Sequence, residues 1–261
     1  MRRLLALFKL FGIDFARMAS AVQDLPRFFV TRRRYRTIVS SSHALFPSGK
    51  TVPCLGDHKA ENGCGRGAYF CQDLWVAQQI FRQAPERHVD VGSRVDGFVA
   101  HVAAFRELEV IDIRPLYDPI PNVSFKQADM MGALPEALVG CCDSLSCLHA
   151  LEHFGLGRYG DPIDPDGWKK GFDNLCALLK PGGRLYLSVP IGPSRVEFNS
   201  QRVFAVPVVL ELLAGRFAME GFAVIDDRGL LRANVDWEGE AALENCGCTC
   251  GCGIFVARKI A

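Results

Sequence analysis

From residue 87 onward, short apolar segments alternate with segments in which apolar residues recur every three or four positions. The first pattern predicts buried β-strands, and the second predicts helices. The predicted strands are 88–92, 108–113, 123–128, 143–148, 184–190, 222–226 and 254–259. The predicted helices between them are 96–106, 168–180 and 203–214. This alternation is typical of βαβ units, so we expect a three-layer α/β domain with a mainly parallel sheet and helices on both faces.

The residues that precede these strands form a predicted helix and a predicted loop. Residues 69–81 have helical spacing. The apolar residues aligned along this helix are Phe70, Leu74, Ala77 and Phe81. Residues 40–68 are rich in Ser, Pro, Gly and Cys and have no period, which indicates a connecting loop. We therefore expect the α/β domain to span residues 69–261.

Residues 1–39 have the pattern of a basic amphipathic helical arm. Its apolar residues recur at helical spacing and share one face: Leu4, Phe8, Phe11, Phe15, Met18 and Val22. Residues 1–36 contain nine lysines and arginines against two aspartates, a net charge of +7, so the rest of the chain carries −6. Two interpretations stay open. The arm packs on the α/β domain, or it makes peripheral contact with the inner face of an anionic membrane.

The composition is that of an ordinary globular protein, with 49% hydrophobic and 23% charged residues. A net charge of +1 gives no support for a nucleic-acid partner, so we expect none. The eleven cysteines cannot all pair, because their number is odd. We find no convincing cleavable signal, since Lys9 interrupts the first apolar stretch, and no apolar run of roughly 20 residues that could span a bilayer. These features predict reduced thiols and a cytoplasmic location.

The first predicted strand ends in a glycine-containing turn that is suited to a nucleoside ligand. Gly92 follows the strand, Gly97 opens the next helix, and Asp112 ends the second strand twenty residues after Gly92. An acid at that distance accepts hydrogen bonds from a ribose. Arg94 stands where a dinucleotide-binding turn has its second glycine, which argues against a pyrophosphate at the helix terminus. A phosphate-free nucleoside such as S-adenosylmethionine makes no such demand.

Four segments carry a resemblance to known proteins: DVGSRVDGF (90–98), VIDIRPL (110–116), SLSCLHALEHFG (144–155) and LLKPGGRLYLSVPIG (178–192). Over about residues 69–258, the chain resembles class I S-adenosylmethionine-dependent methyltransferases. Within that superfamily, it is similar to the uncharacterised domain-of-unknown-function 268 family. The resemblance implies a Rossmann-like seven-stranded sheet with an antiparallel last strand, and S-adenosyl-L-methionine as cofactor.

The resemblance also implies a set of cofactor-binding residues: Asp90, Gly92, Ser93, Arg94, Gly97, Asp112, Ile113, Asp129 and Leu148. Asp90 would orient the glycine turn and the ligand's amino group, and Gly92 and Ser93 would lie against its amino-acid part. Asp112 would bind the ribose. The adenine would lie beside Ile113, with Asp129 at its amino group, and Leu148 would border the sulfonium together with His149. Arg94 departs from the family pattern and could hold the ligand's carboxylate.

Three polar residues after the fourth strand are candidates for catalysis. A hydroxyl acceptor needs a base to remove its proton, and our candidates are His153 and His149, with Glu152 as an orienting partner. The alternative is that this cluster only fastens the turn through hydrogen bonds. The same residues spell the H-x-x-E-H zinc-protease pattern, but a predicted strand precedes them and glycines follow, so the continuous helix that zinc would need is not expected.

The acceptor side of the site is less marked in the sequence. Glu197, Asn199 and Arg202 follow the fifth long strand and either line an acceptor pocket or form a solvated loop. Tyr69, Gln72 and Asp73 either cover the cofactor or form a surface helix face, and the surface reading is favoured. We do not expect a metal at the cysteines of residues 246–252, because alternate thiols on an extended strand lie too far apart for tetrahedral zinc.

The sequence therefore predicts a methyltransferase that acts on an oxygen of a small-molecule or glycan-type acceptor. One alternative is a catalytically silent protein of the same fold that binds a ligand or partner. A second is a nicotinamide-dependent oxidoreductase, which a comparison of the binding of S-adenosylhomocysteine and NAD would distinguish.

Overall fold

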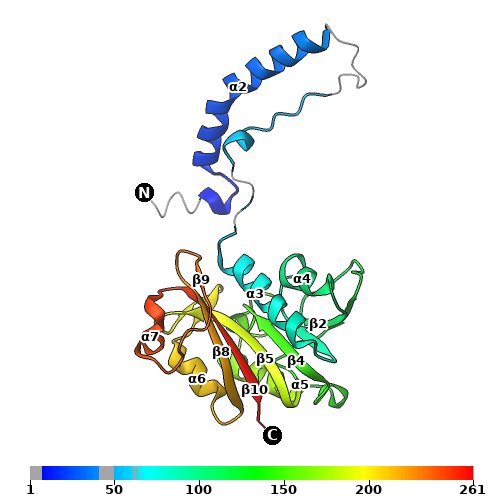
Figure 1. Cartoon of the computed structure of the whole chain (residues 1–261), viewed down its shortest axis with the longest axis vertical. Helices are drawn as coiled ribbons and strands as arrows, with labels where there is room; N and C mark the ends of the chain where they lie inside the picture. The colour runs from blue at the N-terminus through cyan, green and yellow to red at the C-terminus, as the bar shows by residue number, and fades with distance from the viewer. Residues whose placement is uncertain (1–7, 41–49, 61–62, 64, 261) are drawn as a thin grey trace. The chain divides into compact units, whose positions relative to one another are not determined.

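The computed structural model describes residues 8–40, 50–60, 63 and 65–260 (Figure 1). The chain divides into two compact units, Met1–Cys64 and Gly65–Ala261. This division falls four residues before the predicted start of the α/β domain at residue 69. The two units are described separately.

The first unit contains a long helix, α2 (Phe15–Ser40), and a short 3-10 helix, η1 (Asp57–Lys59). The Asp14 carboxylate accepts hydrogen bonds from the backbone N–H groups of Ala16 and Arg17, at 3.0 and 3.1 Å, and thereby caps the start of α2. Gly12 has a φ of 80°, so the predicted helix is not continuous through residues 11–14. Part of the prediction for this arm, at residues 1–7, lies outside the described residues.

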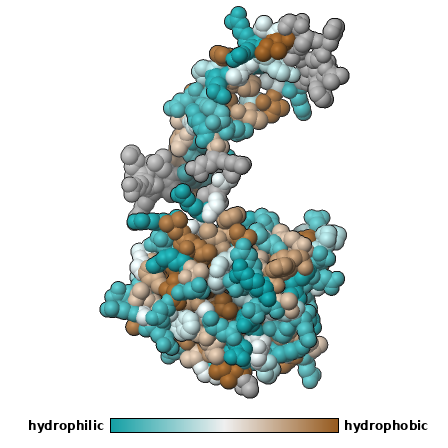
Figure 2. Space-filling view, viewed as in Figure 1, coloured by the Kyte–Doolittle hydropathy of each residue, from teal (hydrophilic) through white to brown (hydrophobic). Residues whose placement is uncertain are grey.

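The apolar stripe that the sequence predicts in the arm is exposed within this unit. Phe11, Phe15, Met18 and Val22 are between 46% and 76% exposed. Figure 2 shows hydrophobic and hydrophilic side chains next to one another along α2. Among the described residues, no helix has both the length and the apolar character needed to cross a membrane.

The second unit is built on an eight-stranded sheet with the order β3-β2-β1-β4-β5-β10-β8-β9. The strands are β1 (His88–Val91), β2 (Leu108–Asp112), β3 (Val123–Gln127), β4 (Cys142–Leu148), β5 (Leu179–Ile191), β8 (Phe217–Ile225), β9 (Leu231–Arg232) and β10 (Gly251–Lys259). Strands β1 to β5 are parallel, and β10 runs antiparallel between β5 and β8. The predicted α/β class, its seven strands and its antiparallel last strand are confirmed, and β9 adds a two-residue strand at one edge.

Helices cover both faces of this sheet and make three layers. They are α3 (Ala68–Gln83), the π-turn η2 (Val95–Val99), α4 (Ala100–Ala103), α5 (Gly167–Leu178), α6 (Val206–Leu213) and α7 (Glu240–Leu243). One buried cluster joins the sheet to α5 and α6 through residues such as Phe172 and Val209. A second cluster joins the other face to α3 and η2 through residues such as Ile80 and Phe98. The remaining elements are η3 (Glu136–Leu138), η4 (Leu151–His153), η5 (Asn245–Gly247) and a separate hairpin of β6 (Arg195–Glu197) and β7 (Gln201–Val203).

Helix α3 packs through a different face from the one that its aromatic residues suggest. The predicted alignment placed Phe70, Leu74 and Phe81 on one face with Ala77. Phe70, Leu74 and Phe81 are exposed, however. The ring of Phe81 contacts that of Phe105 edge-on, with 5.3 Å between the ring centres. The buried residues of α3 are Gln72, Asp73, Val76, Ala77 and Ile80. The packed face includes two polar residues because its first turns border a cavity rather than the apolar core.

Candidate functional site

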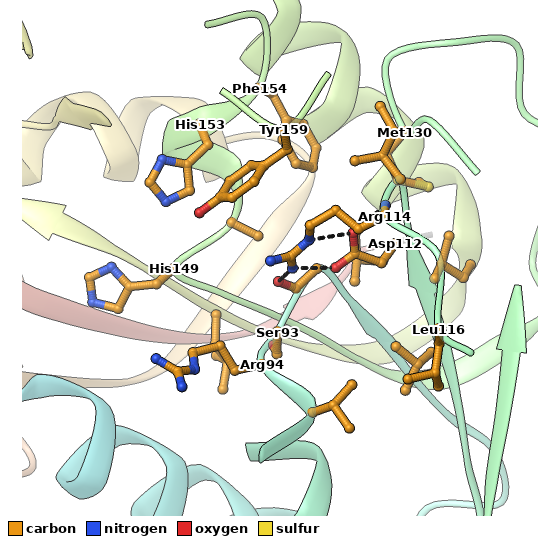
Figure 3. A pocket seen from close by; sticks show the side chains of 18 of the residues that line it. Ser93, Arg94, Asp112, Arg114, Leu116, Met130, His149, His153, Phe154 and Tyr159 are labelled. Atoms are coloured by element: carbon orange, nitrogen blue, oxygen red, sulfur yellow. Dashed lines mark hydrogen bonds and ion pairs between the residues drawn. The ribbon is translucent and has the colours of Figure 1, made fainter. Parts of the chain in front are cut away.

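A cavity of about 520 Å³ lies at the carboxyl ends of β1, β2 and β4 (Figure 3). In an open parallel sheet this is the usual place for a ligand, because the strand order reverses there. Nine of the residues proposed from the sequence line the cavity: Gly92, Ser93, Arg94, Asp112, Ile113, Asp129, Leu148, His149 and His153. The proposed residues that do not line it are Asp90, Gly97, Glu152, Glu197, Asn199 and Arg202.

Gly92 brings the turn after β1 into direct contact with the turn after β4. It has a φ of 75°, and its N–H donates to the carbonyl of Ile111 at 2.9 Å. A Cβ on Gly92 would lie 2.7 Å from the Cβ of Ala150. This position therefore requires glycine both for its backbone conformation and for the close approach of the two turns.

Asp90 lies beneath the cavity and holds the turn from behind. Its carboxylate accepts hydrogen bonds from the backbone N–H and hydroxyl of Ser93, at 3.1 and 2.7 Å, and from the hydroxyl of Ser146 at 2.5 Å. Complete burial raises the pKa of Asp90 to about 7, although these hydrogen bonds act in the opposite direction. The structure therefore gives Asp90 a role in shaping the turn.

His88 continues the same buried chain of polar groups. Its Nε2 lies 3.1 Å from the hydroxyl of Ser146, and its Nδ1 lies 2.8 Å from that of Ser144. Burial lowers the pKa of His88 to about 3, so the imidazole is neutral. His88 was not predicted from the sequence as part of the site. The feature that could have indicated it is a histidine within the first predicted strand of a parallel sheet, where side chains are buried.

Asp112 ends β2 at the edge of the cavity, and in this structure its carboxylate is paired with Arg114. The Arg114 guanidinium donates to both carboxylate oxygens, at 3.0 and 2.5 Å, and the backbone N–H of Arg114 adds a bond of 2.8 Å. The same guanidinium lies 3.5 Å from the carbonyl of Gly92, in the turn after the neighbouring strand β1, and 4.6 Å from the ring centre of Tyr159. The pairing of Arg114 with Asp112 was not predicted from the sequence, because the role of Asp112 was inferred from its spacing to Gly92 alone.

The remaining wall of the cavity is mostly apolar. Ile113, Leu148 and Met130 contribute to it, and Met130 points into the cavity in Figure 3. Asp129 lies among them, and its carboxylate accepts the N–H of Met131 at 2.8 Å. A flat apolar ligand with a polar edge fits this wall.

Arg94 lies at the cavity rim and is paired with a neighbouring acid. Its Nε and Nη2 donate to the two carboxylate oxygens of Asp96, at 3.0 and 2.7 Å. Both side chains are well exposed. Gly97, in the same segment, lies against α3, since a Cβ there would meet the carboxylate of Asp73 at 2.7 Å.

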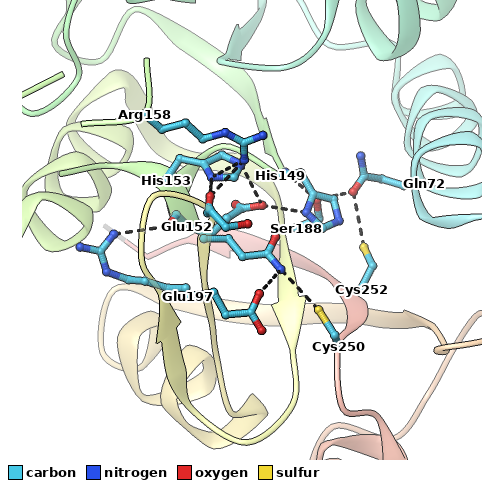
Figure 4. A network of polar contacts seen from close by, with 12 residues as sticks. Gln72, His149, Glu152, His153, Arg158, Ser188, Glu197, Cys250 and Cys252 are labelled. Carbon is cyan, nitrogen blue, oxygen red and sulfur yellow. Dashed lines mark hydrogen bonds and ion pairs between the residues drawn. The ribbon is translucent and has the colours of Figure 1, made fainter. Parts of the chain in front are cut away.

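The three predicted catalytic residues form one buried cluster beside the cavity (Figure 4). His149 has a φ of 50°, and its Nδ1 lies 2.7 Å from Oε1 of Glu152. The same carboxylate oxygen lies 3.7 Å from Nε2 of His153. Both histidines line the cavity, whereas Glu152 lies fully buried behind them. Within the described structure, His149 Nε2 and Glu152 Oε2 are buried without a hydrogen-bond partner.

The environments of the two histidines move their pKa values apart. Burial lowers the pKa of His153, although Glu152 and the carbonyl of Ser200, 2.7 Å from His153 Nδ1, act in the other direction. Burial also acts to lower the pKa of His149, but Cys252 and Glu152 outweigh it and leave that pKa well above its ordinary value. The two histidines therefore differ in proton affinity although both lie near the same Glu152 carboxylate.

Helix α3 provides a further polar wall. Gln72 and Asp73 are 1% and 5% exposed and line the cavity, so the interpretation of these two residues as a surface face is wrong. Gln72 donates to Asp73 at 3.0 Å and accepts the hydroxyl of Ser188 at 2.5 Å. Burial raises the pKa of Asp73. Tyr69 also lines the cavity, with its ring centre 5.3 Å from that of His149.

The three proposed acceptor residues do not face the cavity. Glu197 pairs with Arg195 at 2.8 Å, and Asn199 has a φ of 61° in the connection between β6 and β7. Arg202 is buried, and its guanidinium donates to the carbonyls of Glu152, Phe154 and Pro165 at 3.3, 2.6 and 3.2 Å. In β7, Arg202 and Val203 are both buried, and the Arg202 side chain fastens the segment after β4.

Neither metal pattern is assembled in the described part of the chain, which holds no group of three or more His, Cys, Asp or Glu side chains able to share an ion. The H-x-x-E-H segment is a short 3-10 turn rather than a helix. In the cysteine-rich segment, Cys248 and Cys252 belong to the two different core clusters. The Asp227 carboxylate holds this segment through the N–H groups of Thr249 and Cys250.

Comparison with known proteins agrees with this architecture. The fold is the Rossmann-like fold of class I methyltransferases. Residues 135–227 match the family described as Caenorhabditis protein of unknown function, DUF268, so the resemblance to that family found in the sequence is confirmed. Among curated proteins, no sequence matches this chain.

Three solved structures illustrate the likeness in fold. The 1,6-didemethyltoxoflavin-N1-methyltransferase of Burkholderia thailandensis has a TM-score of 0.50 and 17% identity, over 75% of this chain and 80% of that one. The [4+2]-cyclase SpnF has a TM-score of 0.51 and 15% identity, over 77% and 86%. A putative sarcosine dimethylglycine methyltransferase of Galdieria sulphuraria has a TM-score of 0.50 and 13% identity, over 72% and 84%.

Proposed function

We propose that this protein is an S-adenosylmethionine-dependent methyltransferase. The observation that carries the proposal is the pairing of a glycine turn with a ribose-type acid in one cavity, at Gly92 and Asp112, without a phosphate-binding loop. The similar Burkholderia enzyme was solved with S-adenosylhomocysteine and a small-molecule substrate. The cofactor supplies an activated methyl group, so the protein has to bind, align and exclude water.

The residues present fit this cofactor. Asp112 offers its carboxylate to the ribose hydroxyls. Ile113 would lie beside the adenine, with Asp129 at its polar edge, and Leu148 would border the sulfonium. Arg94 at the rim can hold the amino-acid carboxylate, since a guanidinium binds carboxylates with two parallel bonds.

We assign the role of general base to His153. The carbonyl of Ser200 fixes its Nδ1 as the donor, which leaves Nε2 to accept a proton from an acceptor hydroxyl. Its lowered pKa keeps it unprotonated at neutral pH, as a base must be. Glu152, which lies buried behind both histidines and is held by His149, positions the His153 imidazole. We therefore favour O-methylation of a small molecule or a saccharide.

Calorimetry tests the cofactor assignment. S-adenosylhomocysteine should bind and NAD should not, and Asp112→Ala should weaken binding about tenfold, as expected for the loss of hydrogen bonds to a charged group. The matched control is Asp173→Ala, which also removes a carboxylate paired with an arginine, but outside the cavity. Absence of heat with S-adenosylhomocysteine would exclude the proposal.

Transfer of a tritiated methyl group to small-molecule fractions tests the chemistry. His153→Ala should lower transfer about a hundredfold while cofactor affinity stays nearly constant. If cofactor binds but no acceptor from any fraction is labelled, a silent binding protein of this fold is the better description. The [4+2]-cyclase with the same fold shows why transfer has to be measured rather than assumed.

We further propose that the arm makes peripheral contact with the inner, cytoplasmic face of an anionic membrane. On α2, exposed Phe15, Met18 and Val22 lie ahead of the basic run Arg32, Arg33, Arg34 and Arg36. The protein should sediment with vesicles that contain phosphatidylserine but not with pure phosphatidylcholine, and added salt should release it. Replacement of these four arginines by glutamine should abolish sedimentation. Equal binding to both vesicle types would disprove the role of charge.

A further inference from the structure

The position of Arg114 indicates how an acceptor is recognised. Three arginines line the cavity, and two of them are paired: Arg94 with Asp96, and Arg114 with Asp112. Arg158 has no carboxylate partner within the described residues. Its Nη1 donates to the carbonyl of Ser200 at 3.0 Å and lies 3.5 Å from Nδ1 of the candidate base His153.

Arg114 occupies the place that a ribose would take. Its guanidinium covers both oxygens of Asp112 and also lies 3.5 Å from the Gly92 carbonyl, which follows the neighbouring strand. A ribose diol that bonds both carboxylate oxygens competes for the same acceptors. Cofactor binding therefore has to displace the guanidinium from Asp112.

Tyr159 gives Arg114 a contact that does not depend on Asp112. The ring of Tyr159 lies 4.6 Å from the guanidinium carbon of Arg114 and 5.1 Å from that of Arg158. One aromatic ring thus contacts two guanidinium groups, which is favourable for each cation. Once Arg114 is displaced from Asp112, neither Arg114 nor Arg158 has a carboxylate partner in the part of the chain that the structure describes. Their guanidinium groups can then bind a carboxylate or phosphate.

We propose that the acceptor carries an anionic group, a carboxylate or a phosphate, which Arg158 and the displaced Arg114 bind beside Tyr159. This inference rests on the proposed function. Binding is ordered, because the cofactor's ribose frees Arg114 before the acceptor's anion can use it. The anion on Arg158 places the acceptor hydroxyl beside His153. Arg114 is thus a specificity-determining residue that couples the two sites.

The first test measures the affinity for S-adenosylhomocysteine by calorimetry. Arg114→Ala removes the competitor at Asp112 and should tighten binding about fivefold, in line with the strength of a partly exposed ion pair. Arg114→Lys keeps the charge but cannot form both bonds, so it should give a smaller gain. The matched control is Arg216→Ala. Arg216 is as exposed as Arg114, is also paired with an aspartate, and lies 4.6 Å from a phenylalanine ring outside the cavity. Unchanged or weaker binding by both Arg114 variants would overturn the proposal.

The second test uses inorganic phosphate and malonate as probes, each compared with chloride at equal ionic strength. With saturating S-adenosylhomocysteine, one of the two anions should raise the thermal midpoint of the wild type more than it does without S-adenosylhomocysteine. Arg158→Ala and Arg114→Ala should lose this increment, and Arg216→Ala should keep it. The more effective probe identifies the anion as phosphate-like or carboxylate-like. No increment from either anion would overturn the proposal.

The two proposals fail in different ways. If the wild type does not bind S-adenosylhomocysteine, the proposed function itself is wrong. If it binds and Asp112→Ala weakens binding, but neither the Arg114 gain nor the anion increment is found, only this inference is wrong.

Discussion

Gly92 lies where two turns of the cavity are in contact. The loss of stability on its replacement has two parts, one from the backbone conformation and one from the close contact. Gly92→Ala should destabilise the fold by about 2 kcal/mol or more, because a positive φ and a contact of 2.7 Å act together. Gly182→Ala is the matched control, since Gly182 has a φ of 77° but a Cβ added there would have no atom within 4 Å. Urea unfolding should show the smaller loss for Gly182→Ala. Equal losses would show that the close approach is unimportant.

Asp90 makes stability depend on pH in an unusual direction for an acid. Its pKa rises on folding from 3.8 to about 7, so between these values the folded protein keeps a proton that the unfolded chain releases. Its contribution to stability therefore falls as pH rises through this window, by up to about 4 kcal/mol. Asp90→Asn cannot titrate, and the stability of the wild type relative to this variant should decrease from pH 4 to pH 8 in urea titrations. A constant difference would contradict the buried, raised acid.

At the level of single residues, the sequence predicted where site residues lie better than it predicted their hydrogen-bond and ion-pair partners. Asp112 was recognised because strand ends of a parallel sheet meet at one edge, and spacing alone locates them. Its pairing with Arg114 depends on the path of the chain after β2, which no periodicity encodes. Arg202 was misplaced for a similar reason, since a three-residue strand gives too little pattern to show which side chains turn inward.

The β6–β7 hairpin supports the turn that contains His153. Arg202→Met keeps the apolar stem but removes three hydrogen bonds to carbonyls around the His153 turn, so it should cost about 3 kcal/mol. Arg195→Met, in the other strand of the hairpin, removes an ion pair and two hydrogen bonds to the carbonyls of Pro193 and Thr249. These contacts are exposed, so water replaces them and the loss should be less than about 1 kcal/mol. Thermal unfolding measures both. Similar midpoints for the two variants would show that the buried guanidinium does not stabilise the segment.

Whole elements were predicted well where both their faces are buried. The central strands are almost entirely buried, and each was located within a few residues. Helix α3 was located, but its packed face was not. An exposed stripe of aromatic and apolar residues competes in the pattern with the buried face, and the buried face is partly polar where it borders the cavity. The predicted helix at 96–106 is a π-turn followed by one helical turn, since Gly97 has φ and ψ values of −127° and −107° that interrupt it.

At the scale of the molecule, the division into two units predicts independent folding. Both core clusters lie wholly within residues 65–261. A chain of these residues alone should keep the thermal midpoint and the S-adenosylhomocysteine affinity of the full protein and should lose vesicle binding. Circular dichroism and calorimetry on both proteins check this. A large drop in midpoint would mean that residues 1–64 stabilise the catalytic unit.

Strand β10 is paired on both sides, with β5 and with β8, yet it follows every other strand in the sequence. During translation, β5 and β8 are synthesised before β10, so the edges of β5 and β8 that pair with β10 stay unpaired until β10 is made. Open edges of this kind recruit other chains. The nascent protein should therefore depend on chaperones until residues 251–259 emerge and close the sheet.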